Sequence, residues 1–331
     1  MFAAEEQGPS ATLFRGGFTN KHYVLANVFV AVAGICGIPS LAAQTPAAAG
    51  IPVHTVVTVE SRHGSTPSDI RREEVLVHEG KERDTVTEWV PAQGDQAALE
   101  FIILLDDGSN MSLGSQLEDI RQFILAQSAS AKVGLAYMQD GIAKIVQSPT
   151  SDHEQVAKAL RLPLGAPGAN GSPYFSLSDL VKRWPAGAPR REVLMVSDGI
   201  DRYYGSGDYL DPYLDEAIED AQRAGIIVSA IYTPGIGHFG HSFYRTYWGQ
   251  LYMAKVAEQT GGEAYYIGMT GPPVAFAPFL DDQARRLTHQ YLLTFLAKPP
   301  KKPGLQPVKI TSEMPKVDLV APDRVFVPAA P

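Results

Sequence analysis

Residues 99–112 have the sequence LEFIILLDDGSNMS, which indicates the class of fold. Leu99 to Leu105 is a short, almost continuous apolar run, which is typical of a β-strand buried on both faces. The run stops at two adjacent aspartates, Asp106 and Asp107, and apolar residues at helical spacing follow from Leu113 to Gln127. A buried strand that leads through a polar loop into a helix is typical of a parallel α/β sheet.

The same alternation continues to residue 289. A second buried strand, EVLMVS at 192–197, stops at Asp198-Gly199. Further strands are predicted at 133–138, 142–146, 226–232 and 263–267, and helices at 152–160, 176–184, 213–224, 247–260 and 275–289. Ser176 is the predicted N-cap of its helix. We therefore expect an α/β fold with a doubly wound, mostly parallel sheet flanked by helices.

Both flanks of this region are rich in β-type sequence. Strands are predicted at 53–60, 75–80 and 84–90, and again at 308–311 and 316–320 after a proline-rich stretch. We expect the two flanks to pair into one small β module, with the α/β region inserted between them. The predicted division of the chain is 1–43 signal peptide or uncleaved anchor, 44–52 linker, 53–95 N-terminal β module, 96–290 α/β domain and 291–331 C-terminal β tail.

The N-terminal segment indicates export. A weakly positive region precedes the apolar run Val28 to Ile38, and small residues follow it. This pattern favours a secretory signal peptide, and the run is short for a membrane span. An uncleaved anchor and a start downstream of Met1 remain open alternatives. The single cysteine, Cys36, lies in this segment, so we expect a mature chain without disulfides, either periplasmic or secreted.

Composition excludes some classes of function. The formal net charge is -8, with 19% charged residues, and the sequence contains no cluster of basic residues that could bind phosphate groups. A nucleic-acid partner is therefore not expected, and contact with a membrane is expected only through an N-terminal anchor. No nucleophile elbow, HExxH motif or phosphate loop is present, so the chain is not expected to be an enzyme.

Acidic residues follow the two most apolar strands. Asp106 and Asp107 end the first, and Ser197-Asp198 ends the second. Ligands of open α/β sheets bind beyond the carboxyl ends of the strands, so these side chains are expected at one rim. Carboxylate and hydroxyl oxygens suit a hard divalent cation, although acids here could simply cap the following helix. Because Asp106 and Asp107 are adjacent, their side chains are expected to diverge.

FIILLDDGSNMS with VLMVSDG later in the chain resembles the von Willebrand factor A family. The resemblance implies a metal-ion-dependent adhesion site in which Asp198 is the metal-proximal carboxylate. The first motif of the family, Asp-x-Ser-x-Ser, is altered here. Counting from Asp107 puts Ser109 at the third position and Ser112 one place late, whereas counting from Asp106 puts glycine and asparagine at the serine positions. Either the loop has an insertion or the site has lost ligands.

The remaining candidate residues lie in loops at the same rim. The resemblance implies a hydroxyl ligand from a middle loop, for which Ser172 is preferred over Ser176 and Ser178. The implied ion is Mg²⁺ or Ca²⁺, with the predicted ligand set Asp106, Asp107, Ser109, Ser112, Ser172 and Asp198. Tyrosines that follow the Ser-Asp-Gly turn are candidates for a partner-binding rim, or for packing of their own loop: Tyr203, Tyr204, Tyr209 and Tyr213. His238 and His241 lack a third ligand, so a zinc site is disfavoured.

A subgroup common in Acidobacteria is more similar still, with a β module before the A-type domain and a segment like HQYLLTFL at 289–296. The favoured function is an exported protein-binding or adhesion-type module that uses the rim, with or without a bridging metal. The alternative is a structural component of an envelope or secretion-related assembly with no working metal site. A metal-dependent hydrolase is a remote third hypothesis.

Overall fold

The structure is a computed structural model that describes residues 50–61, 69–165, 171–204, 211–235 and 242–329. The chain divides into Met1–Ala47 and Ala48–Pro331, and every described residue belongs to the second unit. The predicted signal segment therefore lies outside the described residues. Among the helices that are described, none is both long and apolar enough to cross a bilayer.

The larger α/β sheet has β4 at its centre, paired in parallel with β5 on one side and β7 on the other. Five strands run parallel, and β6 returns antiparallel at one edge through a tight turn at Asp140-Gly141. In spatial order the strands are β6 (Ile142–Thr150), β5 (Ala131–Gln139), β4 (Leu99–Asp106), β7 (Arg190–Ser197), β8 (Ile226–Tyr232) and β9 (Ala264–Tyr265).

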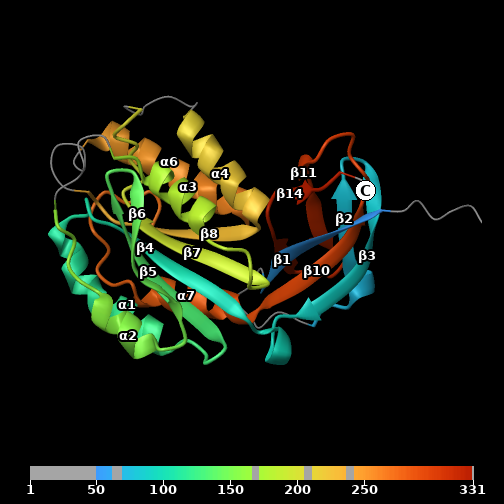
Figure 1. Cartoon of the computed structure of the whole chain (residues 1–331), viewed down its shortest axis with the longest axis horizontal. Coiled ribbons are helices and arrows are strands. Elements are labelled where there is room, and N and C mark those ends of the chain that lie inside the picture. Colours follow the sequence, from blue (N-terminus) through green and yellow to red (C-terminus); the bar gives the residue numbers. More distant parts are fainter. Residues whose placement is uncertain (1–49, 62–68, 166–170, 205–210, 236–241, 330–331) are drawn as a thin grey trace, which may run out of the picture. The chain divides into compact units, whose positions relative to one another are not determined.

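Helices cover both faces of this sheet (Figure 1). Residues of β4 alternate between two cores: Ile102 and Leu104 face one, whereas Phe101 and Ile103 face the other. The first core is covered by α3 (Pro173–Arg183), α4 (Pro212–Ala224) and α6 (Phe243–Thr260). The second is covered by α1 (Leu117–Leu125), α2 (His153–Ala159) and α7 (Ala277–Thr288). The predicted von Willebrand A-type α/β fold class is thereby confirmed.

Some predicted boundaries were wrong. Helix α3 begins at Pro173 with Ser172 as its N-cap, rather than at Ser176, because proline is favoured in the first helical position and Ser172 Oγ accepts the Tyr174 amide. Helix α6 begins four residues before the predicted start of 247, where aromatic residues obscure the helical pattern. The segment before α1 is a 3₁₀ turn, η3 (Met111–Gln116).

A second six-stranded sheet is built from both flanks of the chain. Its spatial order is β12 (Lys309–Ser312), β2 (Val75–Glu79), β3 (Glu82–Pro91), β10 (Gln290–Ala297), β1 (Ile51–Ser61) and β13 (Val317–Val320). All of its pairings are antiparallel. A ribbon that sequence reasoning did not predict, β11 (Gly304–Pro307) with β14 (Arg324–Val327), adds Val325 and Val327 to its core. Short 3₁₀ turns, η1 (Arg72–Glu74) and η2 (Gly94–Gln96), flank β2 and β3.

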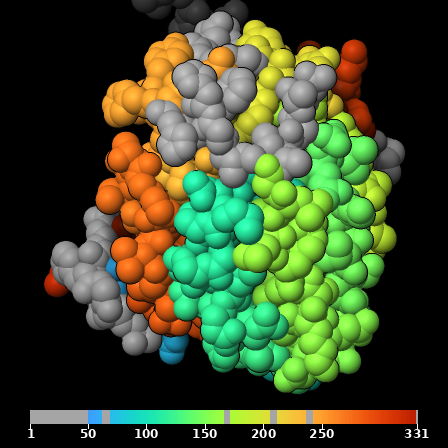
Figure 2. Space-filling model, turned by 90° about the vertical axis from the view of Figure 1, so that its left-hand side faces the viewer, coloured from blue at the N-terminus to red at the C-terminus, as the bar shows by residue number. Residues whose placement is uncertain are grey.

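The carboxyl ends of β4, β5, β7 and β8 lie along one rim of the A-type sheet, because these strands are parallel. Figure 2 shows the molecule from the side of Figure 1 on which these loops lie, with the teal segment after β4 beside green segments from β5 to α2. The rim is where the candidate site is found.

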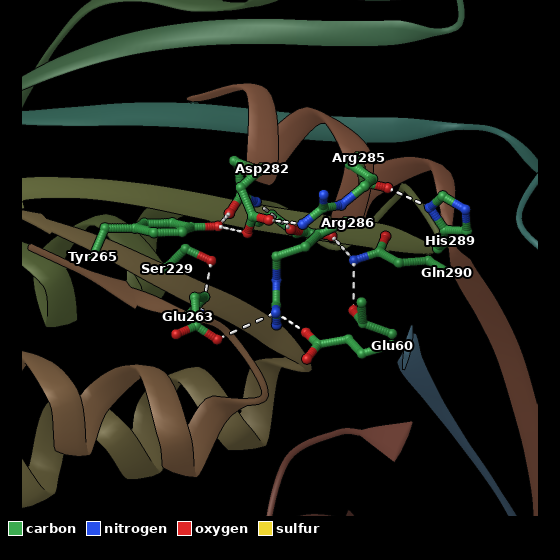
Figure 3. Close-up of polar contacts among 12 residues, drawn as sticks. Glu60, Ser229, Glu263, Tyr265, Asp282, Arg285, Arg286, His289 and Gln290 are labelled. Atoms are coloured by element: carbon green, nitrogen blue, oxygen red, sulfur yellow. Dashed lines mark hydrogen bonds and ion pairs between the residues drawn. The ribbon is translucent and has the colours of Figure 1, made fainter. Parts of the chain in front are cut away.

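A polar junction at the opposite ends of the strands joins the two sheets (Figure 3). The side chain of Arg286, near the end of α7, is 7% exposed and forms ion pairs with Glu60 of β1 and with Glu263, 3.2 Å away, before β9. Four residues later the chain enters β10 at Gln290, whose side-chain amide donates to Glu192 of β7 at 2.6 Å. The last A-type helix and the second sheet are therefore held by the same buried polar groups.

Candidate binding site at the rim of the A-type sheet

The ends of β4 and β7 bring an aspartate and a serine into contact. Leu105 pairs with Val196, so the next residues, Asp106 and Ser197, lie side by side. Ser197 Oγ donates to Asp106 Oδ2 at 2.8 Å, and the Gly108 amide donates to Asp106 Oδ1 at 2.7 Å. Both oxygens of this carboxylate thus accept hydrogen bonds from the chain itself.

Asp106 is buried near another acid. Burial raises the pKa of Asp106 to about 6, and the carboxylate of Asp198 acts in the same direction. The guanidinium of Arg202 and the hydrogen bond from Ser197 oppose this shift. Two carboxylates and one arginine therefore form the electrostatic centre of the rim.

Asp198 is held by Arg202. The guanidinium Nη2 lies 2.5 Å from Asp198 Oδ2, and Nη1 lies 3.3 Å from Oδ1. The side chains are 6% and 1% exposed, so this ion pair is buried. Asp198 Oδ1 also accepts the Ile200 amide at 2.9 Å. Burial alone would lower the pKa of Arg202, but Asp198 and Asp106 outweigh it and raise that pKa.

The loop after β8 lies directly against this ion pair. A Cβ atom on Gly235 would be 1.9 Å from Asp198 Oδ2 and 2.6 Å from Arg202 Nη2. The loop is fixed to the segment after β4 by a bridge between Ser109 and Gly235 and by the Asn110 amide, which donates to the Pro234 carbonyl at 2.9 Å. Only glycine fits at position 235 without displacing the pair.

Asp107 turns away from this centre, as its adjacency to Asp106 predicts. Arg161 holds it with two hydrogen bonds, 2.6 Å to Oδ1 and 2.7 Å to Oδ2, and Gln139 donates to Oδ2 as well. Burial would raise the pKa of Asp107, but the bonds from Arg161 and Gln139 outweigh it, so the pKa falls below its ordinary value. Asp107 thus forms a separate ion pair with the loop that follows α2.

The candidate serines are placed differently from one another. Ser109 Oγ and Ser112 Oγ are buried, and neither has a hydrogen-bond partner within the described residues. Ser172 Oγ donates to Asp201 Oδ2 at 2.6 Å, whereas Ser178 donates to Asp220 on α4. A small pocket of about 30 Å³, enough for one water, lies between Ser172, Ser176, Asp106 and Arg202. Ser176 Oγ lines it without a partner within the described residues.

Asp201 organises the turn that carries the tyrosines. Its Oδ1 accepts the amides of Tyr203 at 2.7 Å and Tyr204 at 2.8 Å, while its Oδ2 accepts the Ser172 hydroxyl. Tyr203 and Tyr204 are 53% and 45% exposed. Both pack edge-on against Tyr213, with centroids at 5.5 and 6.0 Å. Tyr209, like His238 and His241, lies outside the described residues.

The donor set does not fit a divalent cation while Arg202 is in place. All four carboxylate oxygens of Asp106 and Asp198 already accept hydrogen bonds. Asp107 pairs with Arg161, and the Ser172 hydroxyl donates a hydrogen bond to Asp201. Within the described ranges, no group of three or more His, Cys, Asp or Glu side chains is arranged to hold a metal ion. The binding of Mg²⁺ or Ca²⁺ by the predicted ligands therefore stays a prediction from the sequence.

Sequence reasoning missed Arg202 and Asp201. Both lie within four residues of Asp198, in the stretch SDGIDRYY. The available signal was charge: one arginine close to two aspartates, directly after a buried strand. No spacing rule, however, predicts that the chain folds back and places the guanidinium against Asp198.

No family model and no curated protein matches the chain. Among solved structures, an aerotolerance-related membrane protein from Bacteroides fragilis is 14% identical over 57% of this chain and 98% of its own, with a TM-score of 0.41. A von Willebrand factor type A protein from Catenulispora acidiphila is 10% identical over 86% and 75%, with a TM-score of 0.41.

A third solved structure is the von Willebrand factor domain of the type V pili tip protein Mfa5 from Porphyromonas gingivalis. It is 11% identical over 57% of this chain and 94% of its own, with a TM-score of 0.39. The fold assignment of the present chain rests on its own strand order and connections, described above.

Proposed function

We propose that this chain is a protein-binding module whose contact surface is the tyrosine turn at the rim, Tyr203 and Tyr204 with their supporting residues Phe175 and Tyr213. The observation that carries the proposal is that two exposed tyrosines stand on a turn fixed by one buried carboxylate, Asp201. Tyrosine is enriched among the residues that dominate binding energy in protein interfaces.

The turn is organised before any partner arrives. Asp201 is fully buried, and its three hydrogen bonds fix the backbone of the turn to the start of α3. The ring of Phe175 packs against the rings of Tyr203 and Tyr213, with centroid distances of 5.1 and 4.4 Å, so each ring has an aromatic neighbour. A rigid aromatic surface loses little conformational entropy on binding, which favours affinity.

Binding through this turn needs no bridging metal. Arg202 already neutralises part of the acidic centre beneath the turn. The partner would contact the tyrosine rings directly, in place of the metal-bridged carboxylate that the family resemblance implies. The role proposed is binding rather than catalysis.

We also propose that the module acts outside the cytoplasm, in an adhesion-type role, because the apolar run Val28 to Ile38 has the form of a signal peptide. We further propose that the chain belongs to the von Willebrand factor A-related subgroup common in Acidobacteria, which it resembles in sequence. N-terminal sequencing of the protein recovered from the periplasm or medium tests export. A start near residues 43–45 supports cleavage, and recovery of the intact N-terminus from the cytoplasm contradicts export.

Site-specific photocrosslinking in the native host tests the binding surface. A benzophenone amino acid replaces Tyr204 in one strain and, as a matched control, the exposed Phe326 of β14 in another. We expect a discrete protein adduct from position 204 only, and its yield should fall when Tyr203→Ala is added. Equal adducts from both positions, or none from position 204, would contradict the proposal.

A further inference from the structure

The buried guanidinium of Arg202 occupies the place beside the rim carboxylates where the family resemblance implies a divalent cation. It is attracted to both Asp198 and Asp106, which lie at the carboxyl ends of the neighbouring strands β7 and β4 and raise its pKa. It also donates to the Ile200 carbonyl at 3.3 Å, and the Arg202 amide donates to the Gly171 carbonyl at 3.2 Å. The arginine is therefore fixed by its backbone as well as by its charge.

Space around the pair is closed on the side of the β8 loop. The loop packs so closely here that a Cβ atom on Gly235 would lie 1.9 Å from Asp198 Oδ2 and 2.6 Å from Arg202 Nη2. A cavity of about 30 Å³ lies among the described rim residues, and Arg202 forms part of its wall. Because Arg202 contacts both oxygens of the buried Asp198 carboxylate, an ion that binds these oxygens has to displace the arginine.

The negative charge of two buried carboxylates requires a cation such as Arg202 beside them. Asp106 and Asp198 are 8% and 1% exposed, and Arg202 is the cation in contact with Asp198. Removing one partner of a buried ion pair leaves an uncompensated charge, which is strongly destabilising until another positive charge replaces the lost one. Once Arg202 is gone, two carboxylates with the Ser197 hydroxyl offer oxygen ligands of the kind that Mg²⁺ and Mn²⁺ prefer.

We propose that Arg202 is a built-in substitute for the divalent cation and keeps a latent metal site closed, so that the native rim is metal-independent and loss of this one side chain opens it to a hard divalent cation. The inference goes beyond the proposed function, since it concerns the rim in the absence of any partner. Failure of one leaves the other intact.

The test is titration of MnCl₂ into the purified chain, with bound Mn²⁺ followed by electron paramagnetic resonance and stability by thermal unfolding. The proteins compared first are wild type, Arg202→Met and Arg161→Met. Arg161→Met is the matched control, because it removes the equivalent arginine from Asp107, which lies apart from the other two carboxylates. Adding Asp198→Asn to Arg202→Met removes one of the proposed ligands.

We expect no Mn²⁺ binding by wild type or by Arg161→Met, and one bound ion in Arg202→Met that is lost with Asp198→Asn. At free Mn²⁺ about 100-fold above Kd, the melting temperature of Arg202→Met should rise by about 5–10 °C. If Arg202→Met fails to fold in chelator, recovery of the folded state in Mn²⁺ supports the proposal and lack of recovery overturns it. Mn²⁺ binding by wild type that Asp198→Asn abolishes, or a folded Arg202→Met that binds none, also overturns it.

Discussion

Gln290 Nε2 donates a hydrogen bond to Glu192 Oε1 at 2.6 Å and so joins the first residue of β10 to the middle of the A-type sheet. Glu192 is 2% exposed. Burial raises its pKa to about 7, although the bond from Gln290 and the charge of Arg190 act against the shift. The junction between the two sheets therefore contains a carboxyl group that titrates close to neutral pH.

This group predicts a loss of stability as pH rises. Between pH 4.5 and about 7 the folded state keeps the Glu192 proton while the unfolded state has released it, so the free energy of unfolding falls with rising pH. Glu192→Gln removes this titration. The stability of the variant relative to wild type should increase by about 3 kcal/mol from pH 5 to pH 8, measured by urea unfolding. A difference that stays constant with pH would contradict the assignment.

The start of α3 predicts opposite effects for two buried serines in adjacent turns. Ser172→Ala removes the N-cap and the hydroxyl that Asp201 accepts, and should lower the free energy of unfolding by about 1–3 kcal/mol. Ser176→Ala removes a buried hydroxyl without a partner among the described residues, and should be neutral or slightly stabilising. Chemical denaturation of both variants checks this. Equal losses would show that Ser176 also caps the helix.

Adjacent arginines of α7 predict a second contrast. Arg286→Met leaves Glu60 and Glu263 without their buried cation and should cost about 2–4 kcal/mol of stability. Arg285→Met is the control, because Arg285 is 62% exposed and pairs with Asp282 at the surface, a contact worth about 0–1 kcal/mol. Thermal and urea unfolding measure both. Similar losses would mean that the junction does not depend on burial of Arg286.

Close contact at Gly235 predicts that even a methyl group is not tolerated there. Gly235→Ala places Cβ against Asp198 and Arg202 and should lower stability by about 1–3 kcal/mol or more. Gly271→Ala is the control, since no atom lies within 4 Å of a Cβ at that position. Unfolding curves of the two variants decide the point, and a Gly235→Ala protein as stable as Gly271→Ala would disprove the packing.

The strands of the A-type sheet could be predicted because burial on both faces leaves long apolar runs such as 99–105 and 192–197 in the sequence. The start of α3 was misplaced because Ser172 and Ser176 are equally good caps locally, and Pro173 decides between them. The ribbon β11–β14 was missed because it is short and prolines lie within and beside it. Local pattern carries little information about such edges.

The position of the rim could be predicted from the sequence, but the side chains that contact each other there could be predicted only in part. Parallel strands place Asp106 and Ser197 together, and this follows from the order of elements alone. The position of Arg202 depends on the path of a loop and on the absence of a side chain at Gly235, which lies more than thirty positions away in the chain. Contacts of this kind are set by packing in three dimensions and leave no periodic signal.

The arrangement of the second sheet also determines the order in which the protein can fold. During synthesis β1 emerges early, but its neighbours β10 and β13 come from residues 290–297 and 317–320. The A-type strands in between pair largely with strands close in sequence, so that sheet can form first. Until β10 is made, the edges of β1 and β3 remain open to pairing with other chains. A nascent chain stalled before residue 290 therefore exposes strand edges that the finished protein covers, and we expect it to aggregate more readily than the full chain.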